Sequence, residues 1–195
     1  MNDQPTLVLA STSPYRKQLL ERLQIPFNCR APAVDETPHP GESPVDMVRR
    51  LSLEKARAAM SEFNNALIIG SDQVAVVDGK SVGKPGGHEQ AVLQLQRLSG
   101  QTVIYLTGLC LTNTVTGKST VDLVETTVEF RALRDEQIEN YLRKDQPYNC
   151  AGSFRNETLG IALCRRIESE DPTALMGLPL IRLCDMLMAE SYPLL

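Results

Sequence analysis

The chain has 195 residues, 42% of them hydrophobic and 23% charged, with a formal net charge of −4. A chain of this length can bury a sizeable core without disulfide or metal staples, so we expect residues 1–195 to form one domain with two lobes. The acidic balance excludes a protein that binds nucleic acid or an anionic membrane through a generally basic surface. No stretch approaches the roughly 20 apolar residues that a membrane span needs.

Five cysteines are an odd number, and they lie far apart in the sequence without a C-x-x-C motif. That usage argues against both a disulfide framework and a zinc site, and favours a reducing compartment. The N-terminal segment lacks the basic and apolar regions of a secretion signal. We therefore expect a cytoplasmic protein.

Apolar periodicity and turn residues predict alternating strands and helices along the chain. The first half of the chain predicts a strand at 6–11, a helix from Ser13-Pro14 to Pro26, an extended segment at 27–34 and a helix from Ser43-Pro44. Next come a strand that bends at Gly70 into a second strand within 66–80, a helix at 87–98, and a long hairpin within 102–130 with its turn at Thr116-Gly117-Lys118. The last predicted elements are a helix at about 135–144, one or two strands around 160–167, and a helix at about 178–189. This order predicts an α/β fold with a mixed, twisted sheet and flanking helices.

The first candidate site is the strand-to-helix junction within residues 7–24, LVLASTSPYRKQLLERLQ. Ser13 is a good N-cap and Pro14 suits the first helical position. The start of a helix offers unpaired backbone N–H groups and partial positive charge, which suit an anion; Ser11, Ser13 and Arg16 add further donors. The alternative is that Ser13 only caps the helix and Arg16 is solvated.

The second group comprises carboxylates and lysines elsewhere in the chain. Asp35 and Glu36 end an extended segment, and Asp72 directly follows the apolar run LIIG. A carboxylate at the end of a buried strand is unusual unless it is solvated, paired or holding a metal. Carboxylates from two strand ends suit Mg²⁺, which prefers oxygen ligands and bridges phosphates. Lys55 and Lys84 could contact the phosphates, although each could equally be an exposed surface lysine. Together these residues predict a Mg²⁺–polyphosphate site.

Several segments in order along nearly the whole chain carry a family resemblance: LASTSPYRKQLLERL, PAVDE, SLEKARA, IIGSDQVAVVDGKSVGKP, AGSFRNETLGI and LMGLPL. In these motifs the chain resembles the Maf family of nucleotide pyrophosphatases. The resemblance implies an α/β fold related to the inosine triphosphatases, with two lobes around a nucleotide cleft. It also implies hydrolysis of nucleoside triphosphates to monophosphate and pyrophosphate with a divalent cation, Mg²⁺ or alternatively Mn²⁺, and a homodimer.

Matched motif by motif, the resemblance implies a set of catalytic residues, Asp72, Glu36, Lys55 and Lys84, and a set of phosphate-binding residues, Ser11, Ser13 and Arg16. Glu36 and Asp72 would hold the metal. Whether Asp72 is the general base or only a metal ligand stays open at this point.

Three positions, Tyr15, Gln73 and Glu157, bear on the substrate. Together they resemble the branch of the family that acts on 7-methyl-GTP, although that branch usually carries tryptophan at the position of Tyr15. An aromatic ring stacks well on the cationic methylated base, and a carboxylate can accept hydrogen bonds from guanine. The expected function is therefore hydrolysis of 7-methyl-GTP, which would remove modified nucleotides from the pool. The alternatives are a pyrophosphatase for dTTP and UTP or for other modified nucleotides, and a non-catalytic regulator of septum formation.

Overall fold

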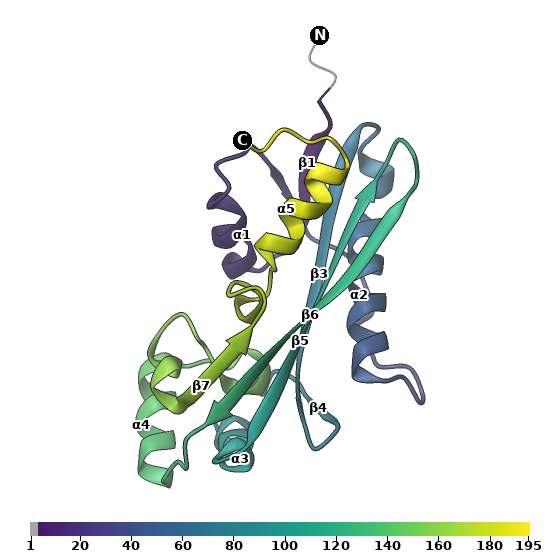
Figure 1. Cartoon of the computed structure of the whole chain (residues 1–195). Coiled ribbons are helices and arrows are strands. Elements are labelled where there is room, and N and C mark those ends of the chain that lie inside the picture. The colour runs from purple at the N-terminus through teal and green to yellow at the C-terminus, as the bar shows by residue number, and fades with distance from the viewer. Residues whose placement is uncertain (1–3) are drawn as a thin grey trace. The chain divides into compact units, whose positions relative to one another are not determined.

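The computed structural model describes residues 4–195, and Figure 1 shows the arrangement of its elements. The strands are β1 (Thr6–Ala10), β2 (Asn28–Arg30), β3 (Ala66–Val77), β4 (Lys80–Val82), β5 (Thr102–Asn113), β6 (Ser119–Phe130) and β7 (Cys164–Ser169). The α-helices are α1 (Pro14–Glu21), α2 (Pro44–Ala58), α3 (His88–Leu98), α4 (Asp135–Asp145) and α5 (Leu180–Ala189). Four short 3₁₀ helices accompany them, at Met60–Glu62, Ala151–Ser153, Leu159–Leu163 and Ala174–Met176.

The strands form one mixed sheet in the order β2-β1-β3-β5-β6-β7, with β4 paired to β3. β1 runs parallel to both β2 and β3, whereas the β3–β4 and β6–β7 pairs are antiparallel. This confirms the predicted α/β class with a mixed sheet and flanking helices. Among residues 4–195, none of the helices combines the length and the apolar character that crossing a membrane requires.

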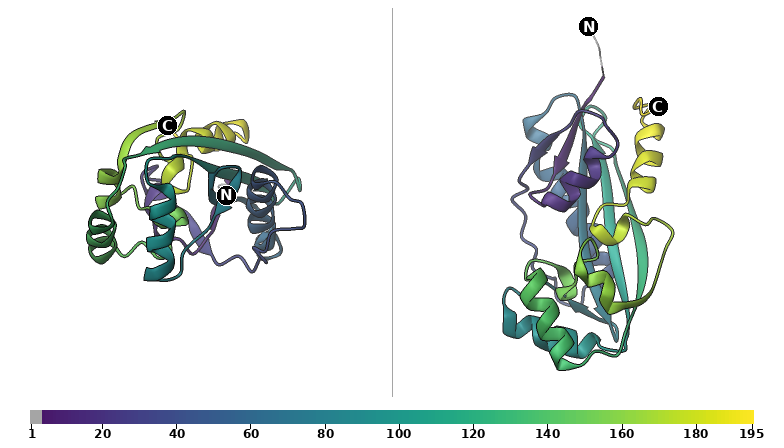
Figure 2. Two further views of the ribbon diagram at one scale, coloured as in Figure 1. Left: turned by 90° about the horizontal axis from the view of Figure 1, so that it is seen from below. Right: turned by 90° about the vertical axis from the view of Figure 1, so that its left-hand side faces the viewer.

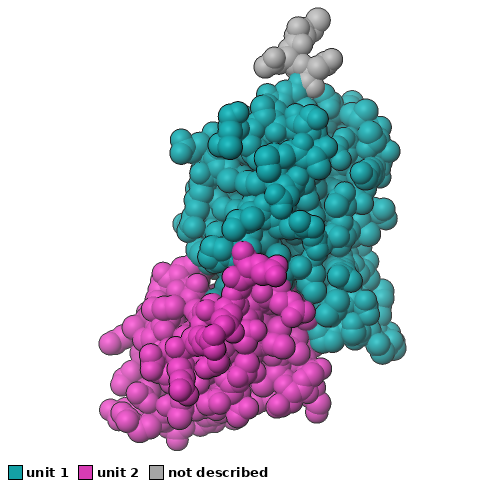
Figure 3. All heavy atoms as spheres, in the orientation of Figure 1, with its two compact units in different colours: residues 1–72, 107–124, 171–195 teal, residues 73–106, 125–170 magenta. Residues whose placement is uncertain are grey.

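The chain divides into two compact units, coloured separately in Figure 3. Unit 1 comprises the described part of residues 1–72 together with 107–124 and 171–195, and unit 2 comprises residues 73–106 and 125–170. The chain passes from one unit to the other within β3, β5 and β6, and once more just after β7.

In unit 1, helices pack on both faces of the sheet; Figures 1 and 2 show the chain from three sides. Leu7 and Leu9 of β1 belong to the apolar cluster that includes Leu19 of α1 and Leu183 of α5. The alternate residues of β1 belong to a second cluster with residues of α2. Because successive side chains of a strand point to opposite faces, α1 and α5 cover one face and α2 covers the other.

The packing of α2 on the sheet is close because glycines stand beneath it. A Cβ atom at Gly70 of β3 would lie 2.1 Å from the backbone oxygen of Ser52, and one at Gly108 of β5 would lie 2.4 Å from the Ser52 hydroxyl. Any larger residue would therefore force α2 away from the sheet.

Unit 2 has a core of its own. α3 packs against α4, and Leu95 of α3 and Leu142 of α4 are fully buried. Phe154 completes the core with ring contacts to Tyr105 and Phe130, at centroid distances of 5.8 and 5.3 Å.

One detail of the predicted elements was wrong. β3 continues through Gly70 to Val77 without the expected bend, so Asp72 lies inside a strand and not at the end of one. Gly70 is there for the close approach of α2, a reason that local sequence does not reveal. Around 160–167, where one or two strands were predicted, the structure has one, β7, preceded by the 3₁₀ helix Leu159–Leu163. The hairpin within 102–130 and the helix starts at Ser13-Pro14 and Ser43-Pro44 are confirmed.

Candidate active site

The start of α1 uses its serine hydroxyls to cap the helix. The Ser13 hydroxyl accepts a hydrogen bond from the Arg16 backbone N–H at 3.4 Å, and the Ser11 hydroxyl accepts one from the Ser13 N–H at 3.1 Å. The capping alternative for Ser13 is therefore what the structure contains. A hydroxyl that accepts one bond still has its own O–H to donate, so capping is compatible with binding an anion.

Arg16 is not a solvated side chain. Its Nε donates to the backbone oxygen of Gly177 at 2.7 Å. Burial lowers the pKa of the Arg16 guanidinium, and the carboxylates of Asp72 and Glu36 act against that shift. Arginine stays protonated under any ordinary condition, so a fixed positive charge lies near both carboxylates.

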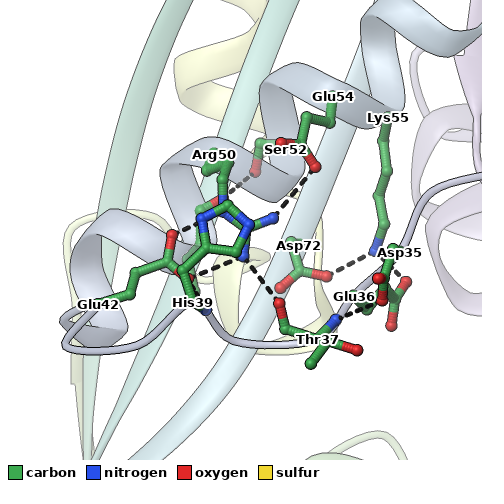
Figure 4. A network of polar contacts seen from close by, with 11 residues as sticks. Asp35, Glu36, Thr37, His39, Glu42, Arg50, Ser52, Glu54, Lys55 and Asp72 are labelled. Carbon is green, nitrogen blue, oxygen red and sulfur yellow. Dashed lines mark hydrogen bonds and ion pairs between the residues drawn. The ribbon is translucent and has the colours of Figure 1, made fainter.

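The ammonium of Lys55 joins two carboxylates, as the dashed lines in Figure 4 show. Its ammonium Nζ lies 2.6 Å from Oε1 of Glu36 and 2.6 Å from Oδ1 of Asp72. The Lys55 side chain is 7% exposed and that of Asp72 12%, whereas that of Glu36 is 53% exposed. A buried ammonium is costly unless it is paired, and here two carboxylates pair with it.

Three separate segments supply this cluster. Lys55 lies on the buried face of α2, and Asp72 lies in β3 beneath that helix. Glu36 comes from the loop between β2 and α2. The absence of a side chain at Gly70, two residues before Asp72, lets α2 approach β3 closely enough to form the Lys55–Asp72 pair.

A turn before α5 supports both Arg16 and β3. The backbone oxygen of Gly177 lies 2.7 Å from Nε of Arg16 and 2.9 Å from the hydroxyl of Ser71. Gly177 has a φ of 101°, a left-handed conformation that favours glycine. Sequence reasoning assigned this residue no role. The glycine of LMGLPL, just before Leu-Pro, was the available sign of a special turn.

The remaining predicted residues divide between the units. Tyr15 follows Pro14 on α1 in unit 1 and is half-buried. Gln73 of β3, the exposed Lys84 after β4, and Glu157 belong to unit 2. Desolvation by neighbouring atoms raises the pKa of the Glu157 carboxyl, although its side chain is on the surface.

Comparison of the whole chain with known protein families identifies the family to which it belongs. A family model described as Maf-like protein matches residues 6–190. The chain belongs to the Maf family. The match includes every residue that the sequence analysis assigned to the site.

Relatives of this Maf protein are similar to it over nearly their full length. A protein of Nitrosococcus oceani is 54% identical over 98% of this chain and 96% of its own, and one of Pseudomonas syringae pv. tomato is 54% identical over 96% and 97%. A third, of a Polaromonas species, is 53% identical over 96% of this chain and 86% of its own. All three are named 7-methyl-GTP pyrophosphatase. A solved structure, the Staphylococcus aureus Ham1 protein, aligns with 65% of this chain and 72% of that chain at 14% identity and a TM-score of 0.49.

A divalent metal has only a limited set of ligands in this Maf protein. Within residues 4–195 there is no group of three or more His, Cys, Asp or Glu side chains arranged to hold a metal ion. Glu36 and Asp72 supply the oxygen donors that Mg²⁺ prefers, and Mg²⁺ ordinarily keeps several waters and binds substrate phosphates. The donor set therefore fits a metal that the protein would share with a bound phosphate, and does not fit an all-protein cage.

Proposed function

We propose that this chain hydrolyses 7-methyl-GTP to 7-methyl-GMP and pyrophosphate. The observation that carries the catalytic part is the Lys55 ammonium held between Glu36 and Asp72, beside the start of α1 and Arg16. The substrate is supported by the relatives named 7-methyl-GTP pyrophosphatase, which match over nearly the whole chain.

In the proposed reaction, water attacks the α-phosphorus and the bond from that phosphorus to the bridging oxygen breaks. Asp72 is assigned as the general base that takes the proton from water. Since Lys55 binds Oδ1 of Asp72, we assign the proton to Oδ2. Pyrophosphate leaves with the bridging oxygen.

Positive charge and hydrogen-bond donors stabilise the phosphates in this proposal. Arg16 keeps its terminal guanidinium nitrogens for phosphate oxygens while its Nε is bound to Gly177. The hydroxyls of Ser11 and Ser13 are assigned to the same phosphates, and Lys84 is assigned to them on the family pattern. A divalent cation held by Glu36 and Asp72 would neutralise part of the phosphate charge when bound.

Base preference is assigned to Tyr15, Gln73 and Glu157. Tyr15 offers an aromatic face, which attracts a cationic base such as 7-methylguanine. The Glu157 carboxylate can accept hydrogen bonds from the guanine N1–H and 2-amino groups. Desolvation raises the pKa of Glu157, and a bound cationic base would act against that shift by favouring the ionised form.

We further propose that the protein works in the cytoplasm as a homodimer. None of its five cysteines, all within residues 4–195, forms a disulfide, which is compatible with a reducing compartment. The homodimer rests on the family resemblance alone.

The test is pyrophosphate release, with Mg²⁺ present, from 7-methyl-GTP, GTP, UTP, dTTP and ITP. We expect a clear preference for 7-methyl-GTP in kcat/KM. Preference for UTP or dTTP would keep the catalytic proposal and contradict the base assignment. No release from any of the five by folded protein would favour a non-catalytic role such as regulation of septum formation.

The base assignment has its own test in a Gln73→Thr, Glu157→Gln double variant. If these side chains set the preference, the ratio of kcat/KM for 7-methyl-GTP to that for UTP should fall by at least about tenfold. An unchanged ratio would remove both residues from the account of specificity.

A further inference from the structure

Glu36 needs more than Lys55 to hold it in place. Residues 31–39 contain no helix or strand, and the Glu36 side chain is 53% exposed. The exposed Glu36 carboxylate remains partly hydrated, and holding its side chain and its irregular loop in one position costs conformational entropy. The position of Glu36 therefore depends on what fixes the loop on either side of it.

Arg50 fixes the loop at two points. Its Nε lies 2.6 Å from Oε1 of Glu42, and its Nη2 lies 2.8 Å from Oε2 of the same carboxylate, a two-pronged pair. Nη2 also donates to the backbone oxygen of Thr37 at 3.3 Å. Thr37 directly follows Glu36 and Glu42 lies near the end of the loop, so one guanidinium contacts both parts of the segment.

The guanidinium that contacts the loop is itself held in place on the helix α2. Arg50 lies on α2 one turn and a half before Lys55, and its Nη1 donates to Glu54 at 3.1 Å. The side chains of Arg50 and Glu42 are only 17% and 8% exposed. The Glu42 carboxylate also accepts from the His39 backbone N–H at 3.0 Å. Figure 4 shows Arg50 among these groups, beside the Lys55 cluster.

We propose that Arg50 is a positioning residue that holds the loop at Thr37 and Glu42 against α2 and thereby directs Glu36 to Lys55. The expected effect of Arg50 on turnover rests on the proposed function, whereas its expected effect on the loop can be tested without substrate. Arginine suits the task because its planar fork can bind a carboxylate through two nitrogens while a third bond goes elsewhere, which lysine cannot match.

The first test is amide hydrogen exchange of the substrate-free protein. In Arg50→Met, we expect the amides of this segment, residues 37–42, to exchange about tenfold faster than in the wild type, because the segment loses its anchor. Since residues 38 and 40 are prolines, the amides measured are those of Thr37, His39, Gly41 and Glu42. Arg49→Met is the matched control, since Arg49 is the neighbouring exposed arginine of α2, and it should leave exchange in this segment unchanged. Unchanged exchange in Arg50→Met would overturn the proposal, whatever the protein hydrolyses.

The second test separates positioning from general destabilisation. Arg50→Met should lower kcat roughly 10- to 100-fold, with the protein folded by circular dichroism, because a displaced catalytic group is costly. In a Glu36→Gln background, the same change should lower kcat by no more than about twofold, since its effect acts through Glu36. Equal losses in both backgrounds would overturn the proposal.

Arg50→Lys keeps the positive charge and guards against a methionine variant that does not fold. We expect its exchange rates and its kcat to lie between those of the wild type and Arg50→Met. Wild-type exchange and kcat in Arg50→Lys would show that the fork is unnecessary and would contradict the proposed geometry. If the wild type releases no pyrophosphate from any nucleotide, the proposed function fails while the exchange comparison still decides whether Arg50 anchors the loop.

Discussion

At the scale of single residues, the site depends on how Lys55 and Asp72 satisfy each other. Both are buried, and each would be unfavourable there without a partner of opposite charge. The Lys55 ammonium contacts Glu36 as well, so it keeps a partner if Asp72 loses its charge. The role of Asp72 in turnover can therefore be separated from its role in folding.

Asp72→Asn should lower pyrophosphate release by at least about 100-fold, because the amide cannot take up a proton from water. The protein should stay folded, since asparagine has the same shape and Lys55 retains Glu36. The measurement is kcat with 7-methyl-GTP, together with circular dichroism. Asp78→Asn, the same change at an exposed turn, is the control and should keep full activity. Near-normal turnover in Asp72→Asn would remove this residue from the mechanism.

At the scale of elements, the site follows from the contact of α2 with β3 and from the loop that precedes α2. Gly70 lets the helix approach the strand that carries Asp72, and the helix in turn carries both Lys55 and Arg50. Arg50 then ties the loop to the helix through Glu42. Displacing α2 would affect all of these contacts together.

Gly70→Ala should lower the free energy of unfolding by about 1–3 kcal/mol or more, because its Cβ would lie 2.1 Å from the Ser52 backbone oxygen. It should also lower kcat, since Lys55 would move with α2. Urea unfolding and kinetics measure the two effects. Gly83→Ala is the stability control, because a Cβ there meets nothing within 4 Å. Equal stability of the two variants would show that α2 can move without cost.

The pair between Glu42 and Arg50 predicts a dependence of stability on pH. Hydrogen bonds from Arg50 lower the pKa of Glu42 from its ordinary value near 4.5 to about 2. Because the folded state has the lower pKa, ionised Glu42 stabilises the fold above pH 4.5, and this contribution is lost as the pH falls toward 2.

Glu42→Gln should therefore be less stable than the wild type at pH 7, and the difference should shrink between pH 5 and pH 2. Urea unfolding at a series of pH values measures it. Glu125→Gln, at an exposed position of β6, should differ little from the wild type throughout. A difference for Glu42→Gln that is constant with pH would show that the ion pair is not its cause.

At the scale of the whole molecule, the chain is only mildly acidic, with 20 Lys and Arg against 24 Asp and Glu. The net charge is −4, yet the site brings Arg16 and Lys55 near Glu36 and Asp72. These four charges balance one another, so a bound triphosphate would keep most of its negative charge unless further cations came with it. We expect a divalent cation bound by the two carboxylates to supply part of that positive charge.

Removal of divalent metal with a chelator should abolish pyrophosphate release, and added Mg²⁺ should restore it. Glu36→Gln should raise the Mg²⁺ concentration needed for half-maximal activity by about tenfold, because one oxygen ligand loses its charge. Binding of Mn²⁺ to the substrate-free protein, followed by calorimetry, provides a readout apart from activity and should weaken in the same variant. Full activity in the chelator would exclude a metal requirement.

Local signals in the sequence were enough to predict the helix starts and the hairpin turn. Ser13 and Ser43 cap helices that begin where the N-cap and proline pattern indicates, and Gly117 lies in the hairpin turn between β5 and β6. Caps, periodicity and turns act within a few residues, so they are legible without the fold. The motifs also named Glu36, Lys55 and Asp72, although not the contacts among them.

The folded structure was needed for every feature that depends on segments distant in the chain. It joined residues 36, 55 and 72 around one ammonium, and it showed that Gly70 serves helix packing and does not bend the strand. It also showed that Arg50 contacts the loop before α2 whereas the neighbouring Arg49 is exposed, a difference that the helical pattern of the sequence does not reveal. Each charged side chain has many possible partners in the sequence, and the packing of distant segments determines which of them it contacts.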